Sequence, residues 1–268
     1  MIRTQLDQVA LNVVDLHKQF SINEALKGVS FTANRGEVVA LLGDNGAGKS
    51  TLVNCIAGKL EPSHGEIQIN GRAQVFSSPS MAQASGIAVV YQDLALVKEM
   101  TVVENLFLNN EIKHRNVILN RLGWLDKKAM LKHGQKLLQR LTNMAIDLNM
   151  PVSKLSIGQQ QVVALIRAVN VGADIIVMDE PTAALGKEQY NHVAELIRLL
   201  SSQGVTILLV SHNLVQVKAL CDRAVVLFQG QSVADVSVSE CNEMELLALI
   251  NGVMQDETSV RLACEYAR

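Results

Sequence analysis

The chain has 268 residues, of which 49% are hydrophobic and 19% charged, and its formal net charge is −2. This composition is typical of a globular protein and argues against intrinsic disorder, and the charge balance gives no sign of a basic field for nucleic acid. No apolar run reaches the roughly 18 residues of a membrane span, and the first residues lack the apolar core of a signal peptide, so a cytosolic protein is expected.

The first part of the chain, residues 9–42, has the pattern of β structure. Two strand-like runs, Val9–Leu16 and Leu26–Thr32, precede Val38–Leu42, a continuous apolar run that suits a sheet buried on both faces. A glycine-rich loop follows, and a helix is expected from Gly48 to Ala57. The next elements expected in chain order are a β-hairpin arm around Glu66–Ile69 and a strand at Ile87–Tyr91.

The second half of the chain alternates helical and strand-like patterns, which predicts an α/β fold with a parallel sheet. The stretch between Gln92 and Leu155 is expected to be an all-helical insertion. The later elements are expected to be helices at Asp126–Leu141, Val162–Val169, Lys187–Leu200 and Glu243–Ile250, strands at Ile175–Met178 and Val205–Val210, and a hairpin of Ala224–Phe228 with Ser232–Val236.

The loop after Val38–Leu42 matches the GxxxxGK[ST] pattern of a phosphate-binding loop. Its glycines let the backbone wrap closely enough for N–H groups to face phosphate oxygens. Lys49 is expected to reach the β- and γ-phosphates, and the Ser50 hydroxyl to ligate Mg²⁺. The nucleotide-binding residues predicted here are Gly43, Asp44, Asn45, Gly46, Ala47, Gly48, Lys49, Ser50 and Thr51.

Two carboxylates, Asp179 and Glu180, directly follow the apolar run Ile175–Met178. Asp179 is expected to hold Mg²⁺ through water, and Glu180 to point in a different direction because it is the next residue. The alternative is that both carboxylates cap the turn at Pro181-Thr182.

A third motif, Leu155-Ser156-Ile157-Gly158-Gln159, lies between the first two, and its hydroxyl, backbone N–H groups and helix N-terminus form an anion site. The order of the three motifs resembles the ATP-binding cassette (ABC) family. This resemblance implies a single ABC ATPase domain over residues 1–268. Residues 1–92 and 155–250 then form a RecA-like core with a small antiparallel β arm, 93–154 a helical subdomain, and 251–268 a tail.

The family resemblance also implies roles for single residues. Glu180 becomes the general base, His212 a contact of the γ-phosphate, and Gln92 a residue that reaches Mg²⁺ and the attacking water. Phe20 is expected to stack on adenine, with a core phenylalanine as the alternative. A second group of nucleotide-binding residues, Ser156, Gly158 and Gln159, is expected to contact the ATP held by another subunit. The resemblance therefore implies that two ATPase subunits meet head to tail.

Two further segments, Tyr91–Val97 and Thr182–Gly186, resemble the ATPase subunits of bacterial monosaccharide importers of the fructose and ribose type. Gly186 departs from the family, which usually has aspartate there. The resemblance implies ATP-driven uptake of a sugar through separate permease subunits, with a sugar-binding protein as an indirect partner. The protein is then peripheral on the cytoplasmic face of the membrane. The permease is expected to contact Leu94–Leu108, whose apolar residues (Leu94, Leu96, Val97 and Met100) otherwise pack under the helices.

Three alternatives stay open. The cargo is instead an amino acid, a nucleoside or a signalling molecule; the protein is a soluble ABC ATPase acting on ribosomes or DNA; or it is a regulatory module without hydrolysis. The second usually has two cassettes, coiled-coil insertions or basic surfaces, and none is evident, so no nucleic-acid partner is expected. Intact Lys49, Asp179, Glu180 and His212 argue against the third.

Overall fold

The computed structural model describes residues 8–114, 121, 123–181 and 185–253. The chain divides into two compact units. Unit 1 comprises Met1–Val89, Asp174–Glu180 and Leu200–Arg268, and unit 2 comprises Val90–Ala173 and Pro181–Leu199. The predicted helical subdomain, residues 93–154, covers less of the chain than unit 2. Its boundaries stay a prediction.

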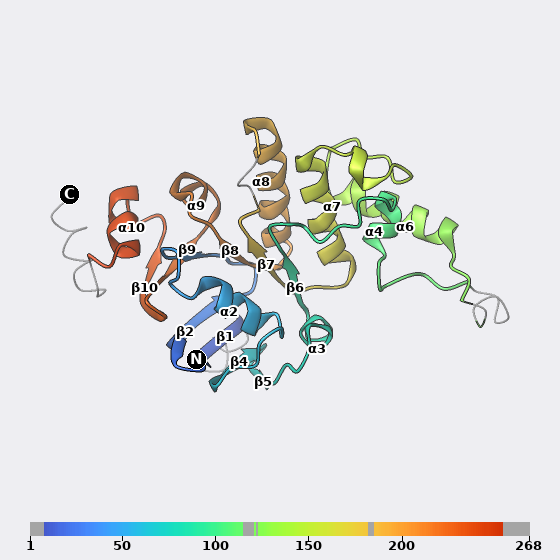
Figure 1. The fold of residues 1–268 in the computed structure, drawn as a ribbon. Coiled ribbons are helices and arrows are strands. Elements are labelled where there is room, and N and C mark those ends of the chain that lie inside the picture. Colours follow the sequence, from blue (N-terminus) through green and yellow to red (C-terminus); the bar gives the residue numbers. More distant parts are fainter. Residues whose placement is uncertain (1–7, 115–120, 122, 182–184, 254–268) are drawn as a thin grey trace. The chain divides into compact units, whose positions relative to one another are not determined.

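The main sheet has, within the described residues, six strands in the order β10-β9-β3-β8-β7-β6. The central strands β3, β7, β8 and β9 pair in parallel, and β10 is antiparallel to β9. Every residue of β3 and β8 is buried, as expected for strands covered on both faces. The bounds are β3 Val38–Leu42, β6 Ile87–Val90, β7 Ile175–Asp179, β8 Thr206–Val210, β9 Arg223–Phe228 and β10 Gln231–Ser237 (Figure 1).

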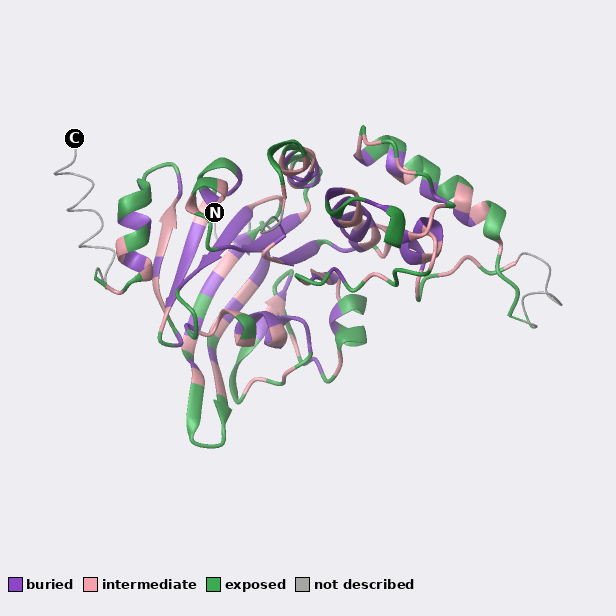
Figure 2. Ribbon diagram, turned by 45° about the horizontal axis from the view of Figure 1, so that its top comes forward, coloured by how far each residue is buried: buried purple, intermediate pink, exposed green. Residues whose placement is uncertain are grey.

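A second, antiparallel sheet has the strand order β2-β1-β4-β5. Its strands β1 and β2 extend beyond the apolar runs that predicted them, because their backbone pairing continues to an exposed, mostly polar tip (Figure 2). Phe20 lies in that tip, and Ser21 turns the chain with φ 51°. The bounds are β1 Val9–Phe20, β2 Asn23–Asn34, β4 His64–Ile69 and β5 Arg72–Gln74.

One hydrophobic core joins the two sheets of unit 1. Leu41 and Leu208 of the main sheet belong to the same buried cluster as Leu11 and Val29 of the antiparallel sheet. The helix α2 adds Leu52, which is fully buried. Removing this apolar surface from water is the main stabilising term for such a core. The helices of unit 1 are α2 Lys49–Ile56, α3 Pro79–Ala84, α9 Leu214–Leu220 and α10 Glu243–Ile250, the last with the predicted bounds.

Unit 2 is built around α7 (Ile157–Asn170), which is buried along most of its length from Gln161 to Ile166. The helices α4 (Val102–Leu106) and α6 (Lys127–Leu141) pack against it. The all-helical expectation for 93–154 was too broad, because described segments on both sides of α6 form loops and isolated β-bridges. The other helical elements are η1 Val152–Lys154 and α8 Lys187–Ser202, of which Lys187–Leu199 belongs to unit 2.

No helix among the described residues combines the length and the apolar character that crossing a bilayer requires.

Candidate nucleotide-binding site

The phosphate-binding loop joins the end of β3 to the start of α2, and its shape depends on glycine at two positions. Gly43 and Gly48 have φ 148° and 104°, in the region that side chains disfavour. A Cβ atom at Gly43 would lie 2.4 Å from the Leu227 carbonyl oxygen, and one at Gly48 would lie 2.8 Å from the Ala25 carbonyl oxygen. The loop therefore packs against β2 and β9 in a way that only glycine allows.

Lys49 folds back over this loop. Its Nζ donates hydrogen bonds to the carbonyl oxygens of Gly43 at 2.7 Å and Asp44 at 3.0 Å. Burial lowers the pKa of Lys49, and the negative charge of Glu180 opposes that shift most strongly. The ammonium group is thus held at the mouth of the loop, where the phosphates of a bound nucleotide are expected.

Asp179 and Ser50 supply oxygen atoms to the same cavity. Burial raises the pKa of Asp179, the charge of Glu180 raises it further, and Lys49 lowers it. A carboxylate and a hydroxyl are hard oxygen ligands, and Mg²⁺ bound to nucleotides needs few protein ligands because water and phosphate fill its other positions. These two residues therefore fit the predicted Mg²⁺ site.

Glu180 and His212 are in direct contact. His212 Nδ1 lies 2.8 Å from Glu180 Oε1, and the Glu180 N–H donates to the Val210 carbonyl oxygen at 3.0 Å. Glu180 has φ 48°, a left-handed conformation that is costly for glutamate and is concentrated at functional sites. The residue predicted as the base and the residue predicted to contact the γ-phosphate are therefore hydrogen-bonded to each other. The sequence analysis did not anticipate this pairing.

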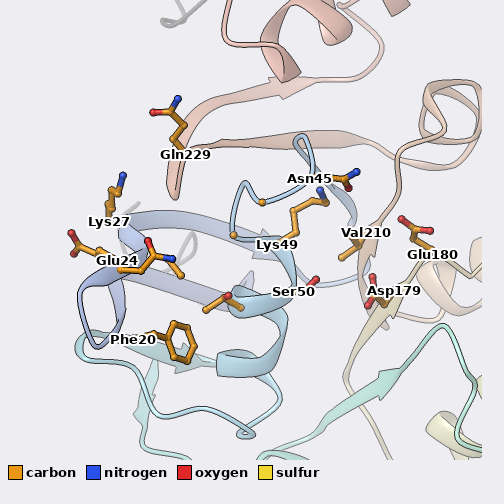
Figure 3. Close-up of a pocket in the computed structure, with 15 residues that line it drawn as sticks. Phe20, Glu24, Lys27, Asn45, Lys49, Ser50, Asp179, Glu180, Val210 and Gln229 are labelled. Atoms are coloured by element: carbon orange, nitrogen blue, oxygen red, sulfur yellow. The ribbon is translucent and has the colours of Figure 1, made fainter.

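The cavity in unit 1 has a volume of about 580 Å³ and extends from Phe20 at one end to Asp179 and Glu180 at the other (Figure 3). Phe20 is 42% exposed, so the alternative of a core phenylalanine is wrong. Lys18 Nζ lies 5.3 Å from the centroid of its ring, within cation–π distance. Stacking of Phe20 on adenine stays a prediction.

Polar residues that the sequence analysis did not single out also line the cavity. They are Asn23, Glu24, Lys27 and Gln229. Backbone hydrogen bonds bring their segments together: the Lys27 N–H donates to Gly230 O at 2.8 Å, and the Gly230 N–H donates to Ala47 O at 3.1 Å. The turn between β9 and β10 was recognised only as a hairpin turn, since nothing in its sequence signals this contact with the loop.

The other predicted nucleotide-binding residues belong to unit 2. Ser156 and Gln159 form a capping box, in which Ser156 Oγ accepts from Gln159 N at 3.2 Å and Gln159 Oε1 accepts from Ser156 N at 3.0 Å. A Cβ atom at Gly158 would lie 2.8 Å from Gln189 Cβ, so close packing against α8 requires glycine there. Gln92 is exposed just beyond β6. Within one chain, these residues thus also have local structural roles.

Comparison with known proteins places the chain in a family. The ABC transporter family model matches residues 26–183, more than half of the chain. The chain belongs to the ABC transporter family. Over 236 residues it is 42% identical to the xylose/arabinose import ATP-binding protein XylG of Sulfolobus acidocaldarius, an alignment that covers 88% of this chain and 91% of that protein.

Another relative, the ribose import ATP-binding protein RbsA of Bacillus subtilis, is 37% identical over 242 residues. That alignment covers 90% of this chain but 48% of the relative, so this cassette spans about half the length of RbsA.

Solved ABC cassettes have the same fold. The ADP conformation of the cassette MJ1267 matches with a TM-score of 0.74 and 28% identity, over 91% of this chain and 95% of that one. A dimeric post-hydrolysis state of the cassette MJ0796 bound to ADP and Pi matches with a TM-score of 0.69 and 25% identity, over 85% and 98% of the two chains. The predicted ABC fold and the assignment as an ATP-hydrolysing cassette are confirmed, while the roles of single residues stay predictions.

In this ABC cassette, Arg167 of α7 holds the loop that follows Gln92. Its guanidinium donates to the carbonyl oxygens of Ala95 at 2.7 Å and Leu94 at 2.9 Å. Both acceptor residues have positive φ, 45° and 58°, so the loop is held in an uncommon conformation. Burial lowers the pKa of Arg167. No sequence motif predicted this contact, because carbonyl acceptors can come from any residue type.

We expect Arg167→Gln to lower the kcat of ATP hydrolysis by about tenfold, because a lost charge-assisted hydrogen bond costs about 1.5–3 kcal/mol and frees the Gln92 loop. Steady-state hydrolysis measured against Mg²⁺ concentration should also show a higher Mg²⁺ requirement, and Arg167→Lys should retain part of the activity. The role through Gln92 is tested by the double variant: Arg167→Gln should add little to Gln92→Ala. Fully additive losses would contradict it.

Proposed function

We propose that this chain hydrolyses ATP to drive sugar uptake, as the ATPase subunit of an importer whose permease is a separate chain. The observation that carries the proposal is the cavity at the phosphate-binding loop, which is lined by Lys49, Asp179 and Glu180, with His212 in contact with Glu180. The names of the relatives, which specify import of xylose, arabinose and ribose, favour a monosaccharide over an amino acid, a nucleoside or a signalling molecule.

Each residue of the cavity has a distinct part in the proposed hydrolysis. Lys49 neutralises the β- and γ-phosphates, and Ser50 and Asp179 hold Mg²⁺, which supplies further positive charge at the phosphates. Glu180 orients the attacking water and accepts its proton. His212, in contact with Glu180 Oε1, fixes that carboxylate and faces the γ-phosphate. Stabilising charge that develops on the transferring phosphoryl group is the largest expected contribution to rate.

The site is proposed to be completed by a second ATPase subunit, either another copy of this chain or a related cassette. The N-terminus of α7 favours an anion through its helix dipole, and unit 1 already has its own phosphate-binding loop. In the proposed head-to-tail dimer, Ser156, Gly158 and Gln159 of one subunit contact the ATP held by the other. The solved cassette MJ0796 is dimeric, which supports pairing of two cassettes.

A permease is proposed to bind the segment Leu94–Leu108, which keeps the subunit on the cytoplasmic face of the membrane. Leu94 is buried, as the alternative of packing under the helices expects, but Val97 is 37% exposed and its backbone is fixed by Asn105 at 2.8 and 2.9 Å. A fixed backbone with an exposed apolar side chain is suited to contact with another protein.

Affinity purification from native membranes should recover this permease and its external sugar-binding protein. Val97→Cys, in a chain whose Cys264 is replaced by serine, should then form a cross-link to the permease; Cys55, Cys221 and Cys241 are buried and leave the reagent free for the new thiol. Leu247→Cys is the matched control, because Leu247 is 46% exposed on α10. Equal cross-linking from both positions contradicts the docking segment. Recovery of ribosomes, or of a binding protein specific for another cargo, contradicts sugar import.

A further inference from the structure

The helix α6 has an unbalanced charge. It carries Lys127, Lys128, Lys132, Lys136 and Arg140 and contains no aspartate or glutamate, although the whole chain has a net charge of −2. Its buried side, which includes Met130, Leu138 and Leu141, packs within unit 2. The positive charge is therefore concentrated on the side that faces solvent, since all five basic residues are exposed. Figure 2 colours the ribbon by burial, with exposed residues in green.

Three of these lysines form a stripe. Lys128, Lys132 and Lys136 are four residues apart, so their side chains lie next to each other on one face. Like charges at this spacing destabilise a helix. Among the described residues, no carboxylate lies within ion-pair distance of any of the three, whereas Lys127 pairs with Glu104 at 3.6 Å. The stripe is thus a source of repulsion that an anionic partner would relieve.

Two exposed apolar side chains lie immediately before this stripe. Trp124, the only tryptophan of the chain, is 61% exposed, and Leu125 is 40% exposed. Their backbone is held in place, because the His114 N–H donates to Trp124 O at 3.0 Å and the Asp126 N–H donates to Ile112 O at 2.7 Å. Asp126 also caps α6 by accepting from Ala129 N at 2.9 Å. The exposure of Trp124 and Leu125 is therefore a feature of an ordered segment.

A hollow lies beside α6. It has a volume of about 280 Å³ and is lined by Ile112, Asp126, Ala129, Lys132, His133 and Lys136. A hollow of this size can hold a phosphate group, and two of the three stripe lysines reach it. Basic side chains beside an exposed tryptophan are the combination that favours a lipid–water interface, where the indole ring lies at headgroup level.

We propose that Lys128, Lys132 and Lys136, together with Trp124 and Leu125, bind anionic phospholipid headgroups. The basic residues complement the charge of the headgroup phosphates. The two apolar residues enter the interface, where an indole ring is favoured at headgroup level. The proposal rests on the proposed function only in that a permease brings a membrane close. Its binding step needs neither ATP nor the permease.

The test uses the purified full chain and vesicles of phosphatidylcholine with or without phosphatidylglycerol. Wild type should bind the anionic vesicles at low salt, with a blue shift of Trp124 fluorescence, and should not bind neutral ones. The triple variant Lys128→Gln, Lys132→Gln, Lys136→Gln should bind about 100-fold more weakly, because each basic residue near such a surface contributes about fivefold. Glutamine keeps the helix propensity close to that of lysine, so folding should be retained.

The matched control removes three exposed positive charges from unit 1 by Arg35→Gln, Lys59→Gln and Arg72→Gln. It should bind vesicles as wild type does. Equal losses in both triple variants, wild-type binding that is independent of anionic lipid, or an unchanged Trp124 spectrum overturns the proposal. Displacement from vesicles by an oligonucleotide at equal phosphate concentration also overturns it. The triple variant of α6 should retain ATP hydrolysis in solution. A loss of lipid binding with normal hydrolysis therefore bears on the lipid site alone and not on the proposed transport function.

Discussion

Lys49→Ala is expected to abolish ATP hydrolysis and to weaken nucleotide binding strongly. The side chain lies across the loop, 2.7 Å from Gly43 O and 3.0 Å from Asp44 O, so its charge is already positioned for the phosphates before a nucleotide arrives. Removing one positioned donor from such a site costs about 10²–10³-fold in rate, and removing a full positive charge from a transferring phosphoryl group costs about 10³–10⁵-fold. We therefore expect a loss of at least about 10³-fold.

Phosphate release and nucleotide affinity should be measured on protein purified identically to wild type, so that contaminating ATPases are equal in both. Lys59→Ala is the control, since Lys59 is exposed just beyond the C-terminal end of α2. This variant should hydrolyse ATP normally. Lys49→Ala should unfold at a temperature close to that of wild type. The variant loses only the two hydrogen bonds from Lys49 Nζ to backbone carbonyl oxygens, which water can replace. Wild-type activity in Lys49→Ala would show that hydrolysis does not occur in this cavity.

The central sheet and the phosphate-binding loop could be predicted from sequence because their physical constraints appear directly in residue type. A strand buried on both faces must be continuously apolar, as Val38–Leu42 and Thr206–Val210 are. The glycines at 43 and 48 are fixed by close contact with neighbouring carbonyl oxygens. In these segments the type of each residue follows directly from its burial or its close contacts.

The parts that sequence could not predict depend on contacts between distant segments. The tip of β1 and β2 is exposed and mostly polar, so apolar periodicity ends before the strands do, although backbone pairing continues to Phe20. The contact of Glu180 with His212 joins residues 32 apart, and the Arg167 hydrogen bonds reach across 72 and 73 residues. Carbonyl acceptors and loop conformations such as that of Glu180 have no signature in a single sequence.

Two glycines of unit 2 show how a family motif and local packing overlap. Gly158 belongs to the predicted anion site, yet its place is also set by Gln189, which a Cβ atom would approach to 2.8 Å. Gly186 is not restricted by packing in this way, because a Cβ atom there would meet only Gln189 Oε1, at 3.9 Å. The backbone at 186 therefore leaves room for the aspartate that the family usually has, and glycine at this position is not required by packing.

The second large effect is expected for Glu180→Gln, which keeps the size of the side chain and its capacity to hydrogen-bond His212 but removes the carboxylate charge. General-base catalysis contributes about 10²–10⁴-fold, so hydrolysis should fall by that amount while ATP still binds. Two ATP molecules should then persist between Lys49 of one subunit and Ser156 of the other. Size-exclusion chromatography should show an ATP-dependent dimer, as the head-to-tail arrangement requires.

Adding a substitution at Ser156 tests where the second subunit contacts the nucleotide. Ser156→Arg, placed in the Glu180→Gln background, should return the protein to monomer, because a bulky side chain blocks the phosphate of the partner. The same change also removes the Ser156 Oγ to Gln159 N capping bond, a loss of about 1 kcal/mol in helix stability. Ser156→Thr retains the hydroxyl and the cap and should leave the dimer intact, which separates the two effects. A Glu180→Gln protein that stays monomeric with saturating ATP and Mg²⁺, both alone and with the permease present, would show that the head-to-tail site is wrong.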